Sequence, residues 1–394
     1  MPLMILIAAV GHSHAADPGT AGYSKQGFSV ADAAGKNNLN LGFSFQPRFS
    51  LTMNGDPDAT DAEALSDTGF RVRRMLFTAN GTVAGRLDYK FRVDAAKAIT
   101  FNDADGKSQT AAKPLLDDAQ VTLRAADSFA VSIGQWKVPF TSQQMASDTT
   151  LLFPERALPL DGLKYGDAKV SGLKWDRDTG AAVSGHVAEK RFEYQAGVFN
   201  GDGANVWPPV DRGFLYVGRV AVAPLGEFKY DEVDLDRGKP RLGVGAAVSM
   251  NDHPSFNDSG ARDGSTTDLR LGGELRFQAS GLSLNGDFVY GTTSPADGTD
   301  SVRAMGYYAQ AGYCLAAGIA PGIRYSRLDP DTGAEDDGVT QIEGVVNYYL
   351  PDFVNEGKNL GHRAQVQLAY THAMMDGLDH GLFDQVTLAT ALTF

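Results

Sequence analysis

Arginine and lysine side chains recur at alternate positions within extended apolar stretches of this 394-residue chain. Successive side chains of a strand point to opposite faces, so each stretch has one apolar face and one charged face. A guanidinium is always charged and binds phosphate or carboxylate oxygens as a planar fork. In a confined, water-filled space, rings of such groups favour small anions. The candidate anion-binding residues are Arg48, Arg71, Arg73, Arg74, Arg92, Arg124, Lys137, Arg219, Arg324 and Arg363.

Acidic residues on the same faces allow a second interpretation of these cations. Carboxylates across neighbouring strands would pair with the arginines, which would then only fill and brace the sheet. These acidic residues are fewer, chiefly Asp88, Asp94, Asp118, Glu193, Glu274, Asp287 and Glu343. The surplus of basic residues predicts a mildly basic interior in a chain whose net charge is -13.

The stretch from Leu39 to Met53 indicates which kind of element positions these side chains. Every odd position in it is apolar, and every even position is small or polar. A length of about 15 residues is roughly three times that of an ordinary soluble strand, and it lets a tilted strand cross a bilayer and protrude. If the apolar face contacts lipid, Arg48 faces the lumen of a barrel.

The same alternation recurs along the chain and predicts an all-β fold, a transmembrane antiparallel β-barrel of about sixteen strands. The expected strands lie near 39–53, 69–80, 86–94, 118–124, 128–136, 181–187, 191–198, 213–222, 240–250, 267–278, 282–290, 302–314, 319–327, 340–349, 362–372 and 384–394. Residues 70–79 change phase, which predicts a bulge. Residues 168–175 could form an extra strand, but an even strand number places them in the strand ending near Val187 or in the loop before it.

The connections between these strands are of two kinds. One set is mostly short, with 224–239 and 351–361 as long exceptions, and the other is long and acidic, as at 55–68 and 329–338. This asymmetry is typical of short periplasmic turns and long external loops. The longest connection, 139–167, carries many apolar residues, which argues against disorder. We therefore expect this third external loop to fold into the pore and narrow it.

The N-terminus has the composition of an export signal. Residues 1–10 are almost wholly apolar, and Ser13-His14-Ala15 is a small-residue cleavage pattern. The expected organisation is a signal peptide at 1–15, a lead segment at 16–36 and a barrel domain at 37–394; the alternative for the first residues is a buried strand. Beyond them no apolar run reaches about 18 residues, which excludes helical membrane spans.

Seven motifs, in order along the chain, resemble the phosphate-selective porins O and P of the Gram-negative outer membrane and their general-porin relatives. They are Gly27-Phe28, Phe70-Arg71-Val72-Arg73-Arg74, Gly134-Gln135-Trp136-Lys137-Val138-Pro139-Phe140, Phe153-Pro154-Glu155-Arg156-Ala157, Val198-Phe199-Asn200-Gly201-Asp202-Gly203, Gly218-Arg219-Val220-Ala221 with Ala223-Pro224-Leu225-Gly226, and Arg324-Tyr325-Ser326-Arg327-Leu328-Asp329. The chain also alternates up to a terminal Phe394, which looks like the signal read by the outer-membrane assembly machinery.

The resemblance implies a sixteen-stranded barrel, a homotrimer, and a third external loop folded inward. In that family, basic residues on the early strands and near the third loop line the anion path; here Arg48, Arg71, Arg73, Arg74, Arg124 and Lys137 lie in that region. The external loops lack the lysine-rich sets of dedicated phosphate channels, so the resemblance does not carry high phosphate specificity. The partners it implies are small anions or other hydrophilic solutes, outer-membrane lipid and lipopolysaccharide.

The leading hypothesis is an outer-membrane diffusion channel for small hydrophilic solutes with an anion or phosphate preference. The alternatives are a non-selective general porin, a barrel enzyme, and a structural barrel plugged by its own loops. For an enzyme, no histidine among His186, His253, His362, His372 and His380 has a serine or acidic partner at a convincing spacing. No Cys/His spacing predicts a metal, no glycine-rich loop predicts a nucleotide cofactor, and no basic patch predicts nucleic acid.

Overall fold

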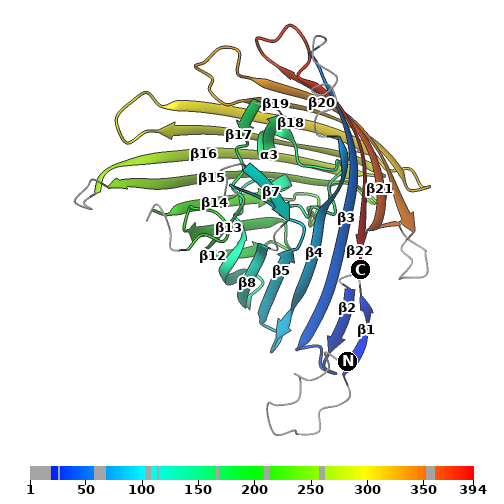
Figure 1. Cartoon of the computed structure of the whole chain (residues 1–394). Helices are drawn as coiled ribbons and strands as arrows, with labels where there is room; N and C mark the ends of the chain where they lie inside the picture. Colours follow the sequence, from blue (N-terminus) through cyan, green and yellow to red (C-terminus); the bar gives the residue numbers. More distant parts are fainter. Residues whose placement is uncertain are drawn as a thin grey trace.

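Sixteen antiparallel strands form a closed barrel in the computed structural model (Figure 1). The structure describes residues 19–24, 27–56, 68–102, 108–112, 115–165, 168–207, 213–256, 262–351 and 360–394. Within these ranges the wall strands are β3 (Asn38–Asn54), β4 (Gly69–Val83), β5 (Leu87–Asp94), β8 (Leu115–Ala126), β9 (Phe129–Lys137), β12 (Arg177–Val187), β13 (Phe192–Phe199), β14 (Leu215–Val222), β15 (Arg241–Phe256), β16 (Arg262–Ala279), β17 (Leu282–Ser294), β18 (Val302–Tyr313), β19 (Ile319–Asp329), β20 (Val339–Pro351), β21 (Leu360–Met375) and β22 (Phe383–Thr393). Each pairs with the next wall strand, and β22 pairs back with β3. The predicted fold class is confirmed.

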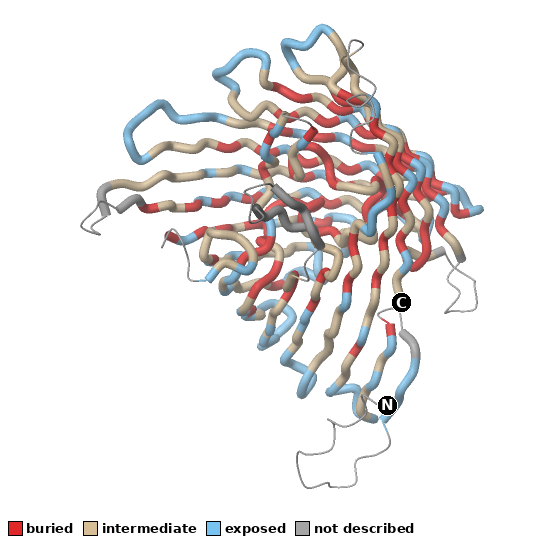
Figure 2. Tube along the Cα trace, viewed as in Figure 1, coloured by how far each residue is buried: buried red, intermediate tan, exposed pale blue. Residues whose placement is uncertain are grey.

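The wall has an apolar outer face and a polar inner face, as the alternating sequence requires. In β3, Leu41 and Met53 are 48% and 37% exposed, whereas Arg48 is only 6% exposed. Figure 2 shows the resulting alternation of buried and more exposed positions along the strands. Because the inner residues are covered by chain inside the barrel, burial here reports a filled lumen, and the exposed apolar residues face outward.

A bulge interrupts the pairing of β3 with β4. Gln46 lies opposite Arg74 and Pro47 lies opposite Val72, so Arg73 is the extra residue. Pro47 has no N–H to donate to a ladder, which makes this position compatible with a bulge. The predicted bulge is confirmed, and its effect is to bring Arg73 and Arg74, which are adjacent in sequence, to the same acidic group.

A short hairpin precedes the barrel. Its strands β1 (Thr20–Ser24) and β2 (Gly27–Ala31) pair with each other, and β2 pairs with the start of β3. Gly27 has a φ of 104°, and a Cβ there would lie 2.1 Å from the carbonyl oxygen of Leu41, so only glycine fits. The alternation pattern predicted no strand in this lead segment; residues 1–18, and with them the predicted signal peptide, lie outside the described residues.

The third loop (residues 138–176) enters the barrel, as predicted. It contains α2 (Ser142–Met145), α3 (Leu158–Asp161) and the hairpin of β10 (Gly162–Tyr165) and β11 (Ala168–Ser171). Figure 1 shows α3 inside the curve of the wall. The possible extra strand at 168–175 is thus partly a loop hairpin and does not join the wall. Another loop hairpin, β6 (Ala98–Asn102) with β7 (Ser108–Ala112), follows β5.

Apolar side chains hold the third loop against one side of the lumen. Phe140, Leu158 and Leu160 form a buried cluster with wall residues that include Leu215, Val289 and Leu328. Leu152 and Phe153 join a second cluster with Tyr349 and Ala369. Trp136 lies at the base of the loop, with its ring 4.9 Å from that of Phe199.

A second segment enters from the opposite, short-turn end of the barrel. This inner segment (residues 223–240) joins β14 to β15, and its residues Glu232, Val233 and Asp234 are 1–3% exposed. Its depth explains the unexpected length of this connection, because a segment that reaches the middle of the lumen and returns cannot be a tight turn. No helix in the described ranges is both long and apolar enough to span a membrane.

Candidate pore constriction

Glu155 of the third loop gathers three predicted site residues from the wall. Its carboxylate lies 2.8 Å from Nη2 of Arg48 and 2.9 Å from Nη2 of Arg74, and it also accepts hydrogen bonds from Arg73. Burial alone would raise the pKa of Glu155, but the guanidiniums of Arg74, Arg73 and Arg48 lower it well below its ordinary value. Glu155 therefore stays ionised and fixes the loop to β3 and β4.

Asp148 forms a second centre of charge on the same loop. It accepts from Arg92 on β5 at 2.9 Å and from Arg156 of the loop at 2.5 Å, and Nε of Arg74 lies 3.8 Å away. Burial would raise the pKa of Asp148, but Arg156, Arg74, Lys137 and Arg92 lower it well below its ordinary value. Each arginine at this centre thus has at least part of its charge compensated.

Two neighbouring carboxylates of β8 extend this network. Asp118 accepts from Nε of Arg177 and from Nζ of Lys90, both at 2.7 Å. Asp117 lies 3.3 Å from Nε of Arg92 and 3.7 Å from Nζ of Lys97. Breaking one buried partner leaves an uncompensated charge, so the network is stable as a unit and sensitive to single substitutions.

Beside this network lies a polar cavity of about 290 Å³ between the third loop and the wall, which we call the passage. Seven basic and five acidic side chains line it, so its lining carries a surplus of positive charge. They are Arg73, Arg74, Lys97, Lys137, Arg156, Lys174 and Arg177, with Asp94, Asp117, Asp148, Asp161 and Asp176. Lys137 donates to the carbonyl oxygen of Ala146 at 2.6 Å, which uses one of its three N–H donors.

The opposite side of the lumen is closed by the loop itself. Arg324 of β19 bonds Glu343 at 2.5 Å, donates to the carbonyl oxygen of Glu155 at 3.0 Å, and stacks on the ring of Phe153. Asn347 donates to the carbonyl oxygen of Leu152 at 2.9 Å. These bonds satisfy the loop backbone inside the barrel and leave the passage along the wall formed by β4, β5, β8, β9 and β12.

The third loop also contacts the inner segment. Nε2 of Gln143 donates to Glu232 at 2.7 Å, and the backbone N–H of Leu152 donates to the same carboxylate at 2.8 Å. The N–H of Glu232 in turn donates to the carbonyl oxygen of Thr150 at 3.1 Å. Two segments that enter from opposite ends of the barrel are thus joined at one buried glutamate.

The structure brings five of the ten predicted site residues to the constriction, namely Arg48, Arg73, Arg74, Arg92 and Lys137. Arg71 lies opposite Arg48 in the ladder, on the same face, and is exposed. Arg324 is on the far side of the loop. Arg124 pairs with Asp88 at 2.6 Å near a short turn, Arg219 lies between Glu193 and Glu274, and Arg363 is a buried residue of β21.

Several residues of the constriction do not stand out in an alternation pattern. Asp148, Arg156 and Glu232 lie in loops, where no strand phase assigns a side chain to the lumen. Arg177 is the first residue of β12, four residues before the strand predicted there. The one available signal is Phe153-Pro154-Glu155-Arg156-Ala157, a charged pair within the apolar loop that was predicted to fold inward.

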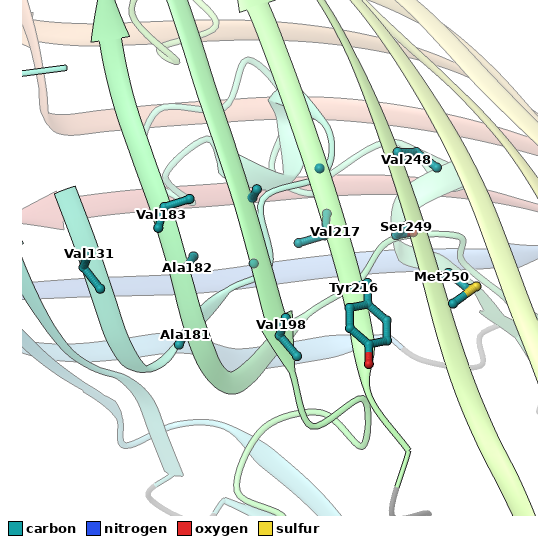
Figure 3. Close-up of a pocket in the computed structure, with 13 residues that line it drawn as sticks. Val131, Ala181, Ala182, Val183, Val198, Tyr216, Val217, Val248, Ser249 and Met250 are labelled. Carbon is teal, nitrogen blue, oxygen red and sulfur yellow. The ribbon is translucent and has the colours of Figure 1, made fainter. Parts of the chain in front are cut away.

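A large apolar hollow lies elsewhere, on the outer wall (Figure 3). It measures about 550 Å³ and is framed by outward residues such as Val131, Val198, Tyr216, Val248 and Met250, with small residues between them. Its lining is almost entirely apolar, so it is suited to contact with lipid chains and does not belong to a path for hydrophilic solutes.

Known proteins agree with this architecture. The outer membrane channel DcaP of Acinetobacter baumannii superposes with a TM-score of 0.56 at 13% identity, covering 92% of this chain and 99% of that one. OmpT of Vibrio cholerae, in-vitro folded and in its trimer form, gives 0.51 at 12% identity, covering 90% and 99%. OprB of Pseudomonas putida gives 0.52 at 10% identity, covering 90% and 94%. At these identities the likeness shows the fold alone. No curated protein matches this chain in sequence.

The sequence profile of one family matches this chain over most of its length. It matches residues 43–320, from the first wall strand to the start of β19, and so includes the whole constriction loop and the wall that faces it. A closed wall with an apolar outer face places such a chain in the outer membrane of a Gram-negative bacterium, where porins are channels. The chain belongs to the family of phosphate-selective porins O and P.

Proposed function

We propose that this outer-membrane channel is a passive diffusion pore for small hydrophilic solutes with a modest preference for anions. One observation carries the proposal, namely the surplus of basic over acidic side chains around the 290 Å³ passage. Arg73, Lys97 and Lys174 are partly exposed, and each also lies within 4 Å of a carboxylate, so each offers a passing ion a partly compensated positive charge. Small anions and other hydrophilic solutes are the proposed cargo.

The extensive ion pairing supports modest selectivity over strict selectivity. Arg48, Arg74 and Arg92 each face a carboxylate within 3 Å, which cancels most of the field they would otherwise project into the passage. A pore must also release what it binds, and a weakly basic passage meets that need better than one tight site. A non-selective general porin is the second candidate, favoured by these same pairs.

Reversal potentials in planar bilayers under a potassium chloride gradient test the proposal. We expect open channels whose reversal potential has the sign of anion preference. A reversal potential of cation sign would overturn the preference, and one near zero would identify the non-selective porin. Barrels that insert but pass no current would identify a plugged barrel, closed where Glu232 joins the third loop to the inner segment.

We also propose that the chain forms a homotrimer, contacts lipopolysaccharide through its acidic loops, and is assembled by the outer-membrane machinery from its terminal strand. The trimer form of the structurally similar OmpT supports the first of these points. With the short turns placed in the periplasm, the acidic loop at 329–338 lies outside the cell.

A further inference from the structure

A second chamber lies on the periplasmic side of the constriction. It measures about 450 Å³ and is bounded by β12 to β16 and by residues 227–231 of the inner segment. Ser147 lines this chamber and its neighbour Asp148 lines the passage, so the two spaces adjoin at the third loop. A solute that crosses the constriction therefore meets this chamber next.

The acidic groups deep in the chamber already have partners. Glu274 binds Nη2 of Arg219 at 2.5 Å. Glu193 accepts from Nη1 of Arg219 at 2.8 Å and from the hydroxyl of Tyr230 at 2.7 Å. Arg219 and these two carboxylates thus form a compensated group. Glu227 and Asp231 add two further carboxylates to the lining, and Lys190, Arg191, Lys229 and Arg276 add four basic groups, so the chamber has a small surplus of positive charge.

Arg276, a wall residue of β16, differs from Arg219 because no carboxylate pairs with it within the described residues. It is 5% exposed, and its Nη1 has no hydrogen-bond partner within the part of the chain that the structure describes. Its guanidinium carbon lies 4.6 Å from the ring centroid of Phe228 and 4.5 Å from that of Tyr230, so two aromatic rings of the inner segment hold it in place. A buried guanidinium without an acceptor is costly, and an oxyanion in the chamber would supply one to the part of the guanidinium that lines it.

The walls near Arg276 indicate what kind of anion fits. Phe228 lies against the guanidinium, and Ala221 and Ala223 add apolar surface to the lining of the same chamber. Lys229 of the inner segment adds a second positive charge to the lining. Inorganic phosphate would gain from the charges but nothing from the apolar walls, whereas an organic carboxylate with an apolar body uses both.

We propose that this chamber is a binding site for small organic carboxylates with an apolar body, with Arg276 as the anchor of the carboxylate and Phe228 as part of the apolar wall. This inference rests on the proposed passage of anions, and it specifies the class of anion that the channel binds during passage. Arg276 donates to the carboxylate oxygens, and the aromatic rings keep the guanidinium oriented. The two faces of the barrel then differ, because the site is reached directly only from the periplasmic end.

Benzoate is the probe for this site, added to one side of a bilayer that contains the full-length channel in potassium chloride. We expect a saturable decrease of the chloride current from one side. The half-saturating concentration should rise by roughly tenfold or more in Arg276→Gln, since a charge-assisted hydrogen bond is lost, and recover in part in Arg276→Lys. The matched control is Arg327→Gln, an arginine paired with Asp376 at the external end, which should leave that concentration unchanged.

Other outcomes would overturn the proposal. An unchanged half-saturating concentration in Arg276→Gln would show that Arg276 does not bind the carboxylate. Equal saturation by uncharged benzamide would show that only the apolar ring is adsorbed. Equal saturation by inorganic phosphate would show that the chamber does not prefer organic carboxylates. If Arg276→Gln does not fold, Phe228→Ala, which changes no wall strand, must weaken benzoate severalfold for the site to stand.

The same bilayers separate this site from the proposed anion preference. If the wild-type reversal potential has the sign of anion preference but benzoate has no effect, the proposed carboxylate site is wrong and the anion preference stands. A reversal potential of cation sign, together with an Arg276-dependent effect of benzoate, would overturn the preference and leave the chamber.

Discussion

At the scale of single residues, the constriction is controlled by two carboxylates of the third loop. Glu155 compensates Arg48, Arg73 and Arg74, and Asp148 compensates Arg92 and Arg156. Because the acids sit on the loop and most of the cations sit on the wall, the same bonds set the position of the loop and the field in the passage. Selectivity and loop position are therefore coupled.

Glu155→Gln should make the channel more anion-selective. The substitution keeps a similar shape and removes one negative charge facing three guanidiniums, which is worth about 1 kcal/mol at about 4 Å in water, or about fivefold in the ratio of anion to cation permeability. Reversal potentials measure that ratio. Glu335→Gln, in the external acidic loop, is the control and should change it little. A shift towards cations in Glu155→Gln would contradict the assignment of this residue.

The charge state of the constriction should resist mild acid. The pKa values of Glu155 and Asp148 lie well below their ordinary values of 4.5 and 3.8, so the ion pairs contribute fully above those values and are lost only as pH falls through the lowered ones. These two ion pairs should therefore contribute no change in single-channel conductance between neutral pH and 4.5, and the conductance should become larger or noisier well below 3.8, when the loop loses these anchors. A transition near neutral pH that disappears in Glu155→Gln would contradict this account.

These residue-scale contacts mark where the sequence stops being predictive. Arg48 can be assigned to the lumen from the phase of β3 alone, because a strand has a strict period of two. Its partner Glu155 is 107 positions away in a loop, and no periodicity relates the two. The sequence left open whether the arginines bind anions or pair with acids, and the structure shows extensive pairing. Arg48, Arg74 and Arg92 pair with loop acids that no strand phase predicts. Arg124, Arg219 and Arg324 pair with acids on the predicted charged faces.

At the scale of elements, the third loop and the inner segment form one filling of the lumen. Their contact at Glu232 involves a side-chain donor and a backbone donor of the third loop. The third loop could be predicted to fold inward, because a solvent-exposed loop would not carry Leu151, Leu152 and Phe153 in sequence. The inner segment could not, since Glu232-Val233-Asp234 has the composition of an ordinary exposed turn.

Glu232→Gln should loosen this filling. Hydrogen bonds to a charged group contribute about 1.5–3 kcal/mol each, so weakening two of them should raise the frequency of current fluctuations by roughly tenfold or more. Single-channel recordings measure the frequency. Asp236→Asn, an exposed position of the same segment, is the matched control. Identical noise in the two variants would show that the contact at Glu232 does not restrain the filling.

At the scale of the whole molecule, the barrel closes next to its last residue. The N–H of Phe394 donates to the carbonyl oxygen of Phe43 at 2.8 Å, and the N–H of Phe43 donates back at 3.0 Å. The two rings stack with centroids 6.4 Å apart. The end of the chain thus completes the seam between the first and last wall strands.

Phe394→Ser should lower the yield of folded barrel in the outer membrane, because it removes the terminal aromatic proposed as the assembly signal. The fraction that shifts its gel mobility on heating measures folded barrel. Phe70→Ser, an outward phenylalanine that is 88% exposed, is the control and should have little effect. Equal yields of folded barrel in the two variants would show that the side chain of Phe394 is not required as an assembly signal.

The oligomeric state is the remaining prediction at this scale. In mild detergent, light scattering corrected for bound detergent should give the mass of three chains. Heating should convert the assembly to single chains before the barrel itself unfolds, since the wall hydrogen bonds lie within one chain. A single-chain mass before heating would contradict the trimer.

The barrel combines a hydrogen-bonded wall with two segments inserted into its lumen, and this combination bears on how its selectivity can change. The number of strands fixes the circumference of the wall, but how much of its cross-section stays open depends on residues 138–176 and 223–240, which fill the lumen and, within the described residues, form no ladder with the wall strands. Substitutions in these two stretches can therefore change which solutes pass. The register of the wall strands, and with it the capacity for insertion into the membrane, is then left unchanged.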